Sequence, residues 1–154
     1  MMARIDFPIG WLANRTNCKV QTIRYYEQIG LLPAPPRSTG NRRLYGHEHA
    51  DRLAFIRHSR ELGFPIDSIR KLLSLADDPD RSCEAADQIA QAQLREVESR
   101  IERLQTLKTE LQRMVKQCRG GRVSECRVIE VLADHALCIN EDHKMSDQVG
   151  TTSP

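Results

Sequence analysis

Five cysteines carry the most distinctive chemistry of this 154-residue chain, because a thiolate is both a nucleophile and a soft metal ligand. They are Cys18, Cys83, Cys118, Cys126 and Cys138. Their number is odd, and the N-terminus lacks the basic stretch and apolar core of a secretory signal. Both observations argue against a disulfide framework and favour reduced thiols that can bind metal in the cytoplasm.

Cys118 and Cys126 are the pair whose spacing most favours a shared ligand. Seven residues, RGGRVSE, separate them, and the two adjacent glycines allow the backbone to turn tightly. Two thiolates so placed suit soft or borderline ions such as Cu(I), Zn(II), Cd(II), Pb(II) and Hg(II). Spacing alone leaves open the alternative that both cysteines are small apolar residues of a core.

The other thiols are weaker candidates. Cys138, with His135 and His143 nearby, could add ligands or form a second site, although the sequence after about residue 136 is typical of a polar tail. Cys18 falls in a predicted turn between two helices, where we expect it to pack as a small apolar side chain.

Charge divides the chain into two unlike halves. Residues 1–72 contain 12 Lys and Arg against 6 Asp and Glu, whereas the remaining residues contain 11 against 15. The first half should therefore attract a polyanion such as double-stranded DNA. No apolar run approaches the roughly 20 residues that a membrane span needs, so we expect a cytoplasmic protein without a membrane partner.

The elements that must position these residues are mostly helical. Residues 8–16 and 20–27 have helical apolar spacing around a turn at Asn17, a pattern that predicts a helix-turn-helix. The next segment, 37–45, combines a Gly-Asn turn with three arginines and predicts a small wing that grips phosphates. A solvated basic hairpin is the alternative.

Three more helices are predicted further along the chain. Residues 47–62 and 65–76 should supply apolar faces to the core through Leu53, Phe55, Ile56, Leu62, Ile66, Ile69, Leu72 and Leu73. From residue 85 a long polar helix carries a single heptad stripe, Leu94, Val97, Ile101, Leu104, Lys108, Leu111, Val115 and Cys118. One apolar stripe on a lone helix needs a partner, which predicts a homodimer.

Together these motifs resemble the MerR family of bacterial transcription regulators. The resemblance rests on the run IGWLANRTNCKVQTIRYYEQIGLLPAPPRSTGNRRLY and on GFPIDSIRKLL. It implies that Arg24 and Tyr25 lie on a recognition helix in the major groove. It also implies that the DNA backbone meets the wing and its approaches at Arg37, Asn41, Arg42, Arg43 and Tyr45.

The same resemblance extends to the second half. It implies an antiparallel coiled coil and a metal-binding loop formed by Cys118 and Cys126. Cys83 matches the third cysteine of the branch that senses divalent ions, where it reaches the loop of the other subunit. This favours Cd, Pb, Zn or Hg over Cu(I), although the seven-residue spacing also resembles the copper-type loop. The implied output is a twisted promoter that RNA polymerase can engage, at efflux or detoxification genes.

The predicted fold class is mainly α. Residues 1–76 form a winged helix-turn-helix head, 77–84 a connector, 85–117 the dimerisation helix, 118–135 the metal-binding loop and short helix, and 136–154 the polar tail. A thiol redox sensor on the same scaffold is the closest rival. A drug sensor would need a large ligand-binding domain, and an enzyme is disfavoured because the loop offers only Glu125 beside its thiols.

Overall fold

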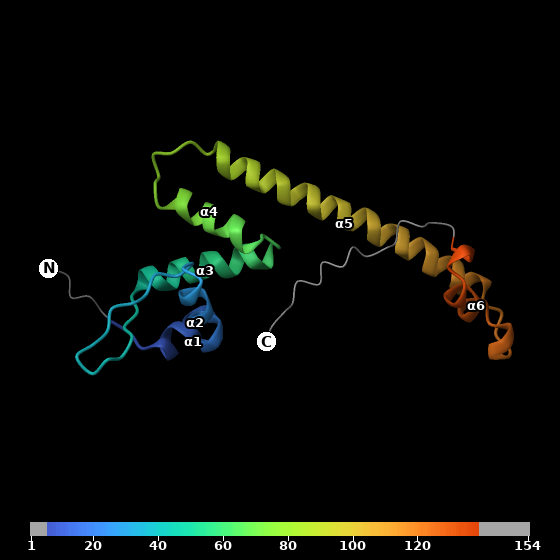
Figure 1. Cartoon of the computed structure of the whole chain (residues 1–154), viewed down its shortest axis with the longest axis horizontal. Helices are drawn as coiled ribbons and strands as arrows, with labels where there is room; N and C mark the ends of the chain where they lie inside the picture. The colour runs from blue at the N-terminus through green and yellow to red at the C-terminus, as the bar shows by residue number, and fades with distance from the viewer. Residues whose placement is uncertain (1–5, 139–154) are drawn as a thin grey trace. The chain divides into compact units, whose positions relative to one another are not determined.

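The computed structural model describes residues 6–138, and this part of the chain consists of helices joined by loops, with no strand beyond isolated bridges. It divides into two compact units between residues 93 and 94. The first unit contains α1, α2, α3, α4 and the start of α5, and the second contains the rest of α5 and α6 (Figure 1).

The first two helices are short and joined by a tight turn. α1 spans Ile9–Thr16 and α2 spans Val20–Gln28. Asn17 ends α1 in the left-handed conformation, with φ at 50°, and the next backbone N–H, that of Cys18, donates to the carbonyl of Ala13. Asn tolerates this conformation better than most residues. The predicted helix-turn-helix is therefore present.

The wing is a small hairpin between α2 and α3. Antiparallel bridges join Arg37 to Arg43 and Phe7 to Tyr45. At the tip the backbone N–H of Asn41 donates to the carbonyl of Ser38 over 2.9 Å, and Asn41 has a φ of 60°. Here the left-handed residue is again an asparagine.

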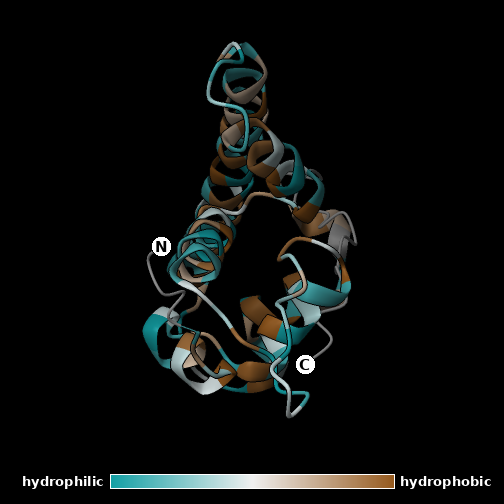
Figure 2. Cartoon of the chain, turned by 90° about the vertical axis from the view of Figure 1, so that its left-hand side faces the viewer, coloured by the Kyte–Doolittle hydropathy of each residue, from teal (hydrophilic) through white to brown (hydrophobic). Residues whose placement is uncertain are grey.

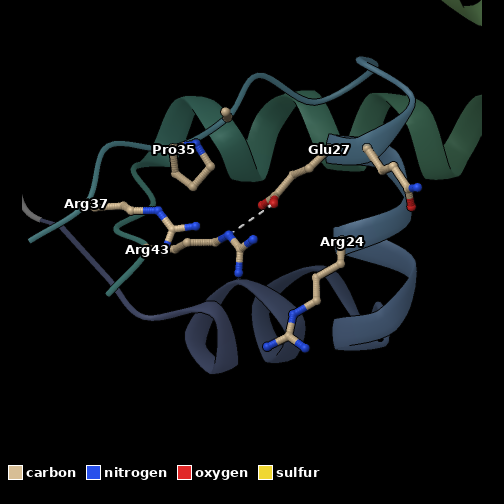
Figure 3. A pocket seen from close by; sticks show the side chains of 7 residues that line it. Arg24, Glu27, Pro35, Arg37 and Arg43 are labelled. Carbon is tan, nitrogen blue, oxygen red and sulfur yellow. Dashed lines mark ion pairs between the residues drawn. The ribbon is translucent and has the colours of Figure 1, made fainter. Parts of the chain in front are cut away.

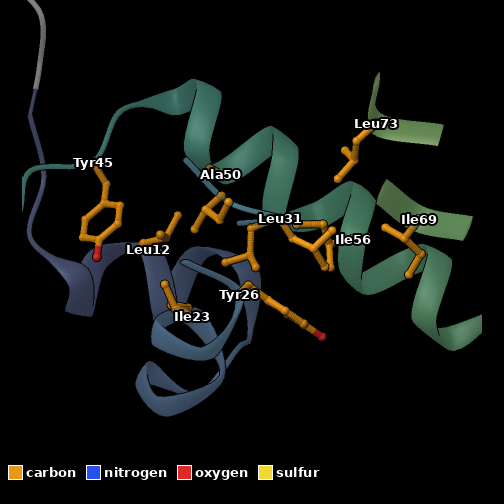
Figure 4. Packing of buried hydrophobic residues seen from close by; sticks show 11 residues of the cluster. Leu12, Ile23, Tyr26, Leu31, Tyr45, Ala50, Ile56, Ile69 and Leu73 are labelled. Carbon is orange, nitrogen blue, oxygen red and sulfur yellow. The ribbon is translucent and has the colours of Figure 1, made fainter. Parts of the chain in front are cut away.

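The core of the first unit lies between the helix-turn-helix and the next two helices, α3 (His47–Glu61) and α4 (Ile66–Ala76). Its buried members come from all four helices and from the loops between them (Figure 4): Leu12, Ile23, Tyr26, Leu31, Leu32, Tyr45, Ala50, Leu53, Ile56, Ile69 and Leu73.

Two residues expected in this core are on the surface. Phe55 is 37% exposed and Leu62 is 55% exposed. Phe55 follows Leu53 by two positions, which turns it by about 200° to the opposite side of the helix. Leu62 comes after the last residue of α3. The predicted contribution of both to the core is wrong.

Arginines on α3 and α4 hold the ends of the first two helices. Arg57 donates to the carbonyl of Thr16 over 2.6 Å, and Arg70 donates to that of Ile29 over 2.6 Å. Carbonyls at a helix C-terminus lack intrahelical partners, so these arginines satisfy them and fix the helix-turn-helix on its support.

α5 spans Glu84–Gln117 and is the longest helix of the described chain. Its heptad stripe lies on the surface: Leu94, Val97, Ile101, Leu104, Leu111 and Val115 are 37–71% exposed. Figure 2 shows apolar residues recurring along this helix. None of the helices within residues 6–138 combines the length and apolar character of a membrane span.

A short C-terminal segment packs on the end of α5. It consists of the 3-10 turn η1 (Val123–Glu125), helix α6 (Arg127–Ala133) and the 3-10 turn η2 (His135–Leu137). Val131 of α6 is buried together with Met114 of α5, and Arg113 of α5 donates to the carbonyl of Leu137 over 2.8 Å. The sequence predicted a short helix within residues 118–135 but neither 3-10 turn.

Candidate DNA-binding surface and thiol pair

The outward face of α2 is polar and accessible. Arg24 and Tyr25 are exposed, as predicted, and so is Gln21; the Tyr25 side chain is 49% exposed. The opposite face of the helix carries Ile23 and Tyr26 into the core. Packing of that inner face therefore determines the direction in which Arg24 and Tyr25 project.

A cleft of about 430 Å³ separates α2 from the wing. Arg24, Glu27 and Gln28 line it from α2, and Ala34, Pro35, Arg37 and Arg43 line it from the segment that forms the wing. Figure 3 shows Arg24, Arg37 and Arg43 in this cleft, with the Glu27 carboxylate paired to Arg43. The excess of positive charge makes this surface attractive to a phosphate backbone.

The wing itself organises two more of the predicted residues. Arg37 donates from Nη1 to the backbone carbonyl and to the side-chain oxygen of Asn41, both over 3.2 Å. The backbone N–H of Arg42 donates to Ser38 Oγ, and the Arg42 side chain is exposed. The loop geometry thus spreads Arg37 and Arg42 on an accessible hairpin.

Tyr45 occupies a different environment from the other predicted DNA-binding residues. Its side chain is completely buried, and its hydroxyl donates to Glu27 Oε1. Burial, together with the hydrogen bond to Glu27, raises the pKa of Tyr45 far above its usual value. The structure therefore places this ring in the core of the head and not on the surface of the wing, where we expected it.

Glu27 lines the same cleft, although it was not expected at this surface. Its contacts depend on how the wing folds back on α2. Its Oε2 lies 3.4 Å from Arg43 Nε, and its side chain is 9% exposed. In the sequence, only its position could have pointed to it, because it is an acid three positions after Arg24 in a strongly basic segment.

The second candidate site is the loop after α5, where Cys118 and Cys126 come together. Gly120 and Gly121 have φ values of 73° and 98°, a region that favours glycine. The pKa of Cys126 is lowered, chiefly by the backbone N–H of Ile129. The N–H of Val128 and the thiol of Cys118 act in the same direction, and burial opposes them. Thiolate is the form that binds metal and attacks electrophiles.

The other described thiols have different surroundings. Cys83 is exposed and immediately precedes α5, whereas Cys118 immediately follows it. Cys18 packs against the core of the head, as predicted, and burial raises its pKa. Within residues 6–138 no three His, Cys, Asp or Glu side chains are grouped to hold a metal.

The further ligands suggested near the C-terminus stay predictions. Cys138 is partly buried, and His135 begins η2. His143 and the tail from residue 139 lie outside the described residues.

A helix-turn-helix with an exposed basic second helix, a basic wing and a long helix ending in paired thiols defines a DNA-binding regulator rather than an enzyme. The model of the MerR helix-turn-helix family of regulatory proteins matches residues 7–76, and that of the MerR DNA-binding region matches residues 50–114. The chain belongs to the MerR family.

Individual relatives agree with this assignment. The chain is 41% identical over 133 residues to the transcriptional regulator ZntR of Escherichia coli K12, which covers 84% of this chain and 94% of the relative. The lead(II) complex of the regulator PbrR691 from Ralstonia metallidurans CH34 is similar, with a TM-score of 0.73, 38% identity and coverage of 82% and 98%. The mercury(II) complex of MerR from Bacillus megaterium MB1 has a TM-score of 0.65, 29% identity and coverage of 83% and 100%.

Proposed function

We propose that this protein is a homodimeric regulator that binds promoter DNA and activates metal efflux or detoxification genes when a divalent thiophilic ion binds. Cys118 and Cys126 of one subunit and Cys83 of the partner subunit would hold the ion. The observation that carries the proposal is the adjacency of two thiols, of which Cys126 has a lowered pKa. Relatives whose structures contain lead(II) or mercury(II) support it.

The chemistry of the donor set fits such an ion. Thiolate sulfur is soft and polarisable, and it prefers Cd(II), Pb(II), Zn(II), Hg(II) or Cu(I) to hard ions such as Mg(II). Two thiolates satisfy a monovalent ion, whereas a divalent ion needs a third or fourth ligand and more negative charge. The match of Cys83 to the family's third ligand therefore favours a divalent ion.

The dimer is supported by the surface of α5. An open apolar groove of about 680 Å³ is lined by Leu104, Leu107, Lys108, Leu111, Gln112, Val115 and Lys116. Such a stripe on an otherwise polar helix gains free energy when a second helix covers it. A second copy of the chain meets this need, and a two-fold dimer suits a two-fold operator.

DNA recognition is assigned to the head. Arg24 and Tyr25 would enter the major groove, while Arg37, Asn41, Arg42 and Arg43 would contact the backbone on either side. Their exposure and the charge of the cleft support this assignment. Tyr45 would act by holding the wing.

Coupling between the two sites requires that ligand binding favour one conformation of the dimer. Only a difference in affinity between two conformations can shift their populations. A ligand set shared between the loop of one subunit and Cys83 of the partner subunit provides such a difference, because it depends on how the subunits are placed. The family resemblance implies the output: a twisted promoter spacer that RNA polymerase can engage.

The test is a titration of reduced, metal-free protein with Cd(II), Zn(II), Pb(II), Hg(II) and Cu(I), following thiolate-to-metal absorption and transcription from the bound promoter. Wild type is compared with Cys83→Ser, and Cys18→Ala is the matched control for loss of a thiol. Divalent ions should bind and activate, and Cys83→Ser alone should lose this response. Activation by Cu(I) only, unaffected by Cys83→Ser, would contradict the divalent assignment.

A thiol redox sensor is the second candidate, because the Cys118 thiol lies close enough to Cys126 to lower its pKa, and two neighbouring thiols can be oxidised to a disulfide. Diamide in metal-free buffer would oxidise the two thiols to a disulfide and be reduced to the hydrazine. Transcriptional activation under those conditions, without any response to metal, would favour this candidate.

A further inference from the structure

Glu27 places a negative charge in the middle of a basic surface. It is a carboxylate that lines the cleft between α2 and the wing, the surface assigned above to DNA. A negative charge there repels phosphate and lowers the affinity for any duplex. An acid in this place needs a compensating role.

Its contacts indicate what that role is. One carboxylate oxygen accepts a hydrogen bond from the Tyr45 hydroxyl. The other lies 3.4 Å from Arg43 Nε, in the ion pair that Figure 3 draws. Arg43 is bridged to Arg37 across the hairpin, and the backbone of Tyr45 pairs with Phe7. Glu27 therefore attaches α2 to the returning arm of the wing at two points.

We propose that Glu27 is a positioning residue that fixes the wing relative to α2, so that the protein gains sequence specificity at the expense of general affinity for DNA. The inference rests on the proposed function, in which α2 and the wing contact the same duplex. Arg43 is tied by its ion pair while its side chain stays 36% exposed, so a phosphate can still reach it.

Two consequences of losing this charge have opposite signs. General attraction to phosphate rises, because the head gains one unit of positive charge. Specific binding falls, because Arg43 and the wing lose the orientation that matches them to α2. Glu27→Gln removes the charge, while its amide oxygen can still accept a hydrogen bond from the Tyr45 hydroxyl. Affinities for a selected and a scrambled duplex then separate the two effects.

The experiment measures affinity for two duplexes by fluorescence anisotropy. The first is the sequence that the wild-type protein selects from a randomised duplex pool, and the second is a scrambled duplex of the same composition. Glu27→Gln is compared with Glu61→Gln, which removes an equal charge from an exposed ion pair with Arg57 at the end of α3.

Glu27→Gln should weaken binding to the selected duplex by about tenfold, in line with the loss of a charged hydrogen-bonding partner. Its affinity for the scrambled duplex should stay unchanged or rise. Glu61→Gln should change the ratio of the two affinities by less than about twofold. In an Arg43→Ala background the effect of Glu27→Gln should shrink to less than about threefold, because the two residues act together.

Other outcomes overturn the inference in recognisable ways. Tighter binding of both duplexes would mean that Glu27 only repels phosphate. Weaker binding of both, with a lower melting temperature, would mean that it only supports the fold. Tyr45→Phe, which keeps the buried ring, should also lower specificity, and an unchanged ratio there would argue against the attachment. If the wild-type protein selects no sequence, the proposed DNA-binding function itself fails.

Discussion

Residues 6–93 contain eleven buried apolar side chains and three large exposed ones, whereas residues 94–138 contain two buried and nine exposed. The first unit packs its apolar residues against one another and ties its helix ends with arginines. The second keeps most of its apolar residues on the surface of α5 and of the loop and helix that follow it. Burial of apolar area is the main favourable term in folding.

The difference indicates two sources of stability. The head is stabilised within one chain, so the residues proposed to contact DNA are held in place before any partner binds. In the proposed dimer the second unit would gain most of its stability from association, and a ligand in the loop would add to it. A regulator built in this way can change the second unit without unfolding the first.

Ile56→Ala should give the largest effect, because Ile56 is completely buried in the head. Removing three carbons there should lower the free energy of unfolding by about 2–5 kcal/mol. Urea denaturation followed by the fluorescence of Trp11 measures it, since this tryptophan stacks on Phe7 in the head and is the only one in the sequence.

Leu132→Ala is the matched control, because Leu132 in α6 is 70% exposed. Its effect should stay within about 0.5 kcal/mol. Equal losses for the two variants would contradict the contrast between a packed head and an open second unit.

Leu104→Glu should separate the subunits while leaving the head folded. Leu104 is 63% exposed and lines the groove on α5. A carboxylate in a helix-helix interface must be desolvated, so the dissociation constant of the dimer should rise by about a hundredfold, equivalent to about 2.7 kcal/mol. Sedimentation equilibrium gives this constant.

Thr109→Glu adds the same charge beyond the heptad stripe, where the Thr109 hydroxyl donates to the carbonyl of Gln105. It should leave the dimer intact. Dissociation by Thr109→Glu as well, or a monomeric wild type, would mean that the α5 stripe serves another purpose.

Much of this contrast could be predicted from the sequence, because helical periodicity is a local property. The helices begin and end within one or two residues of their predicted positions, and the exposed stripe of α5 follows the heptad pattern. Phe55 was misplaced because its neighbours Leu53 and Ile56 suggested a broader apolar face than the helix buries.

The contacts that organise the sites were harder to predict. Tyr45 and Glu27 are 18 positions apart, and their hydrogen bond exists only because the wing folds back on α2. Tyrosine beside three arginines suggested a surface role, whereas tertiary packing buries it. The approach of Cys118 to Cys126 was suggested by the diglycine, but the N–H groups of α6 that favour the Cys126 thiolate depend on where that helix begins.

The smallest expected effect concerns the pH dependence of Cys126. Backbone N–H groups of Ile129 and Val128 stabilise its thiolate and lower its pKa, so more thiolate is present at neutral pH than for a free cysteine, whose pKa is about 8.5. The pKa of Cys126 should stay lowered in Cys118→Ser, because the new hydroxyl can still donate a hydrogen bond to Cys126. The rate of alkylation of Cys126 by iodoacetamide, measured by mass spectrometry over a range of pH, should reach half of its maximum at a lower pH in folded protein than in urea. At pH 7 the folded protein should react faster than the protein in urea by less than about tenfold. Identical midpoints in both states would show that the start of α6 does not activate this thiol. The second unit would then lack the fixed arrangement of side chains that packing gives the head.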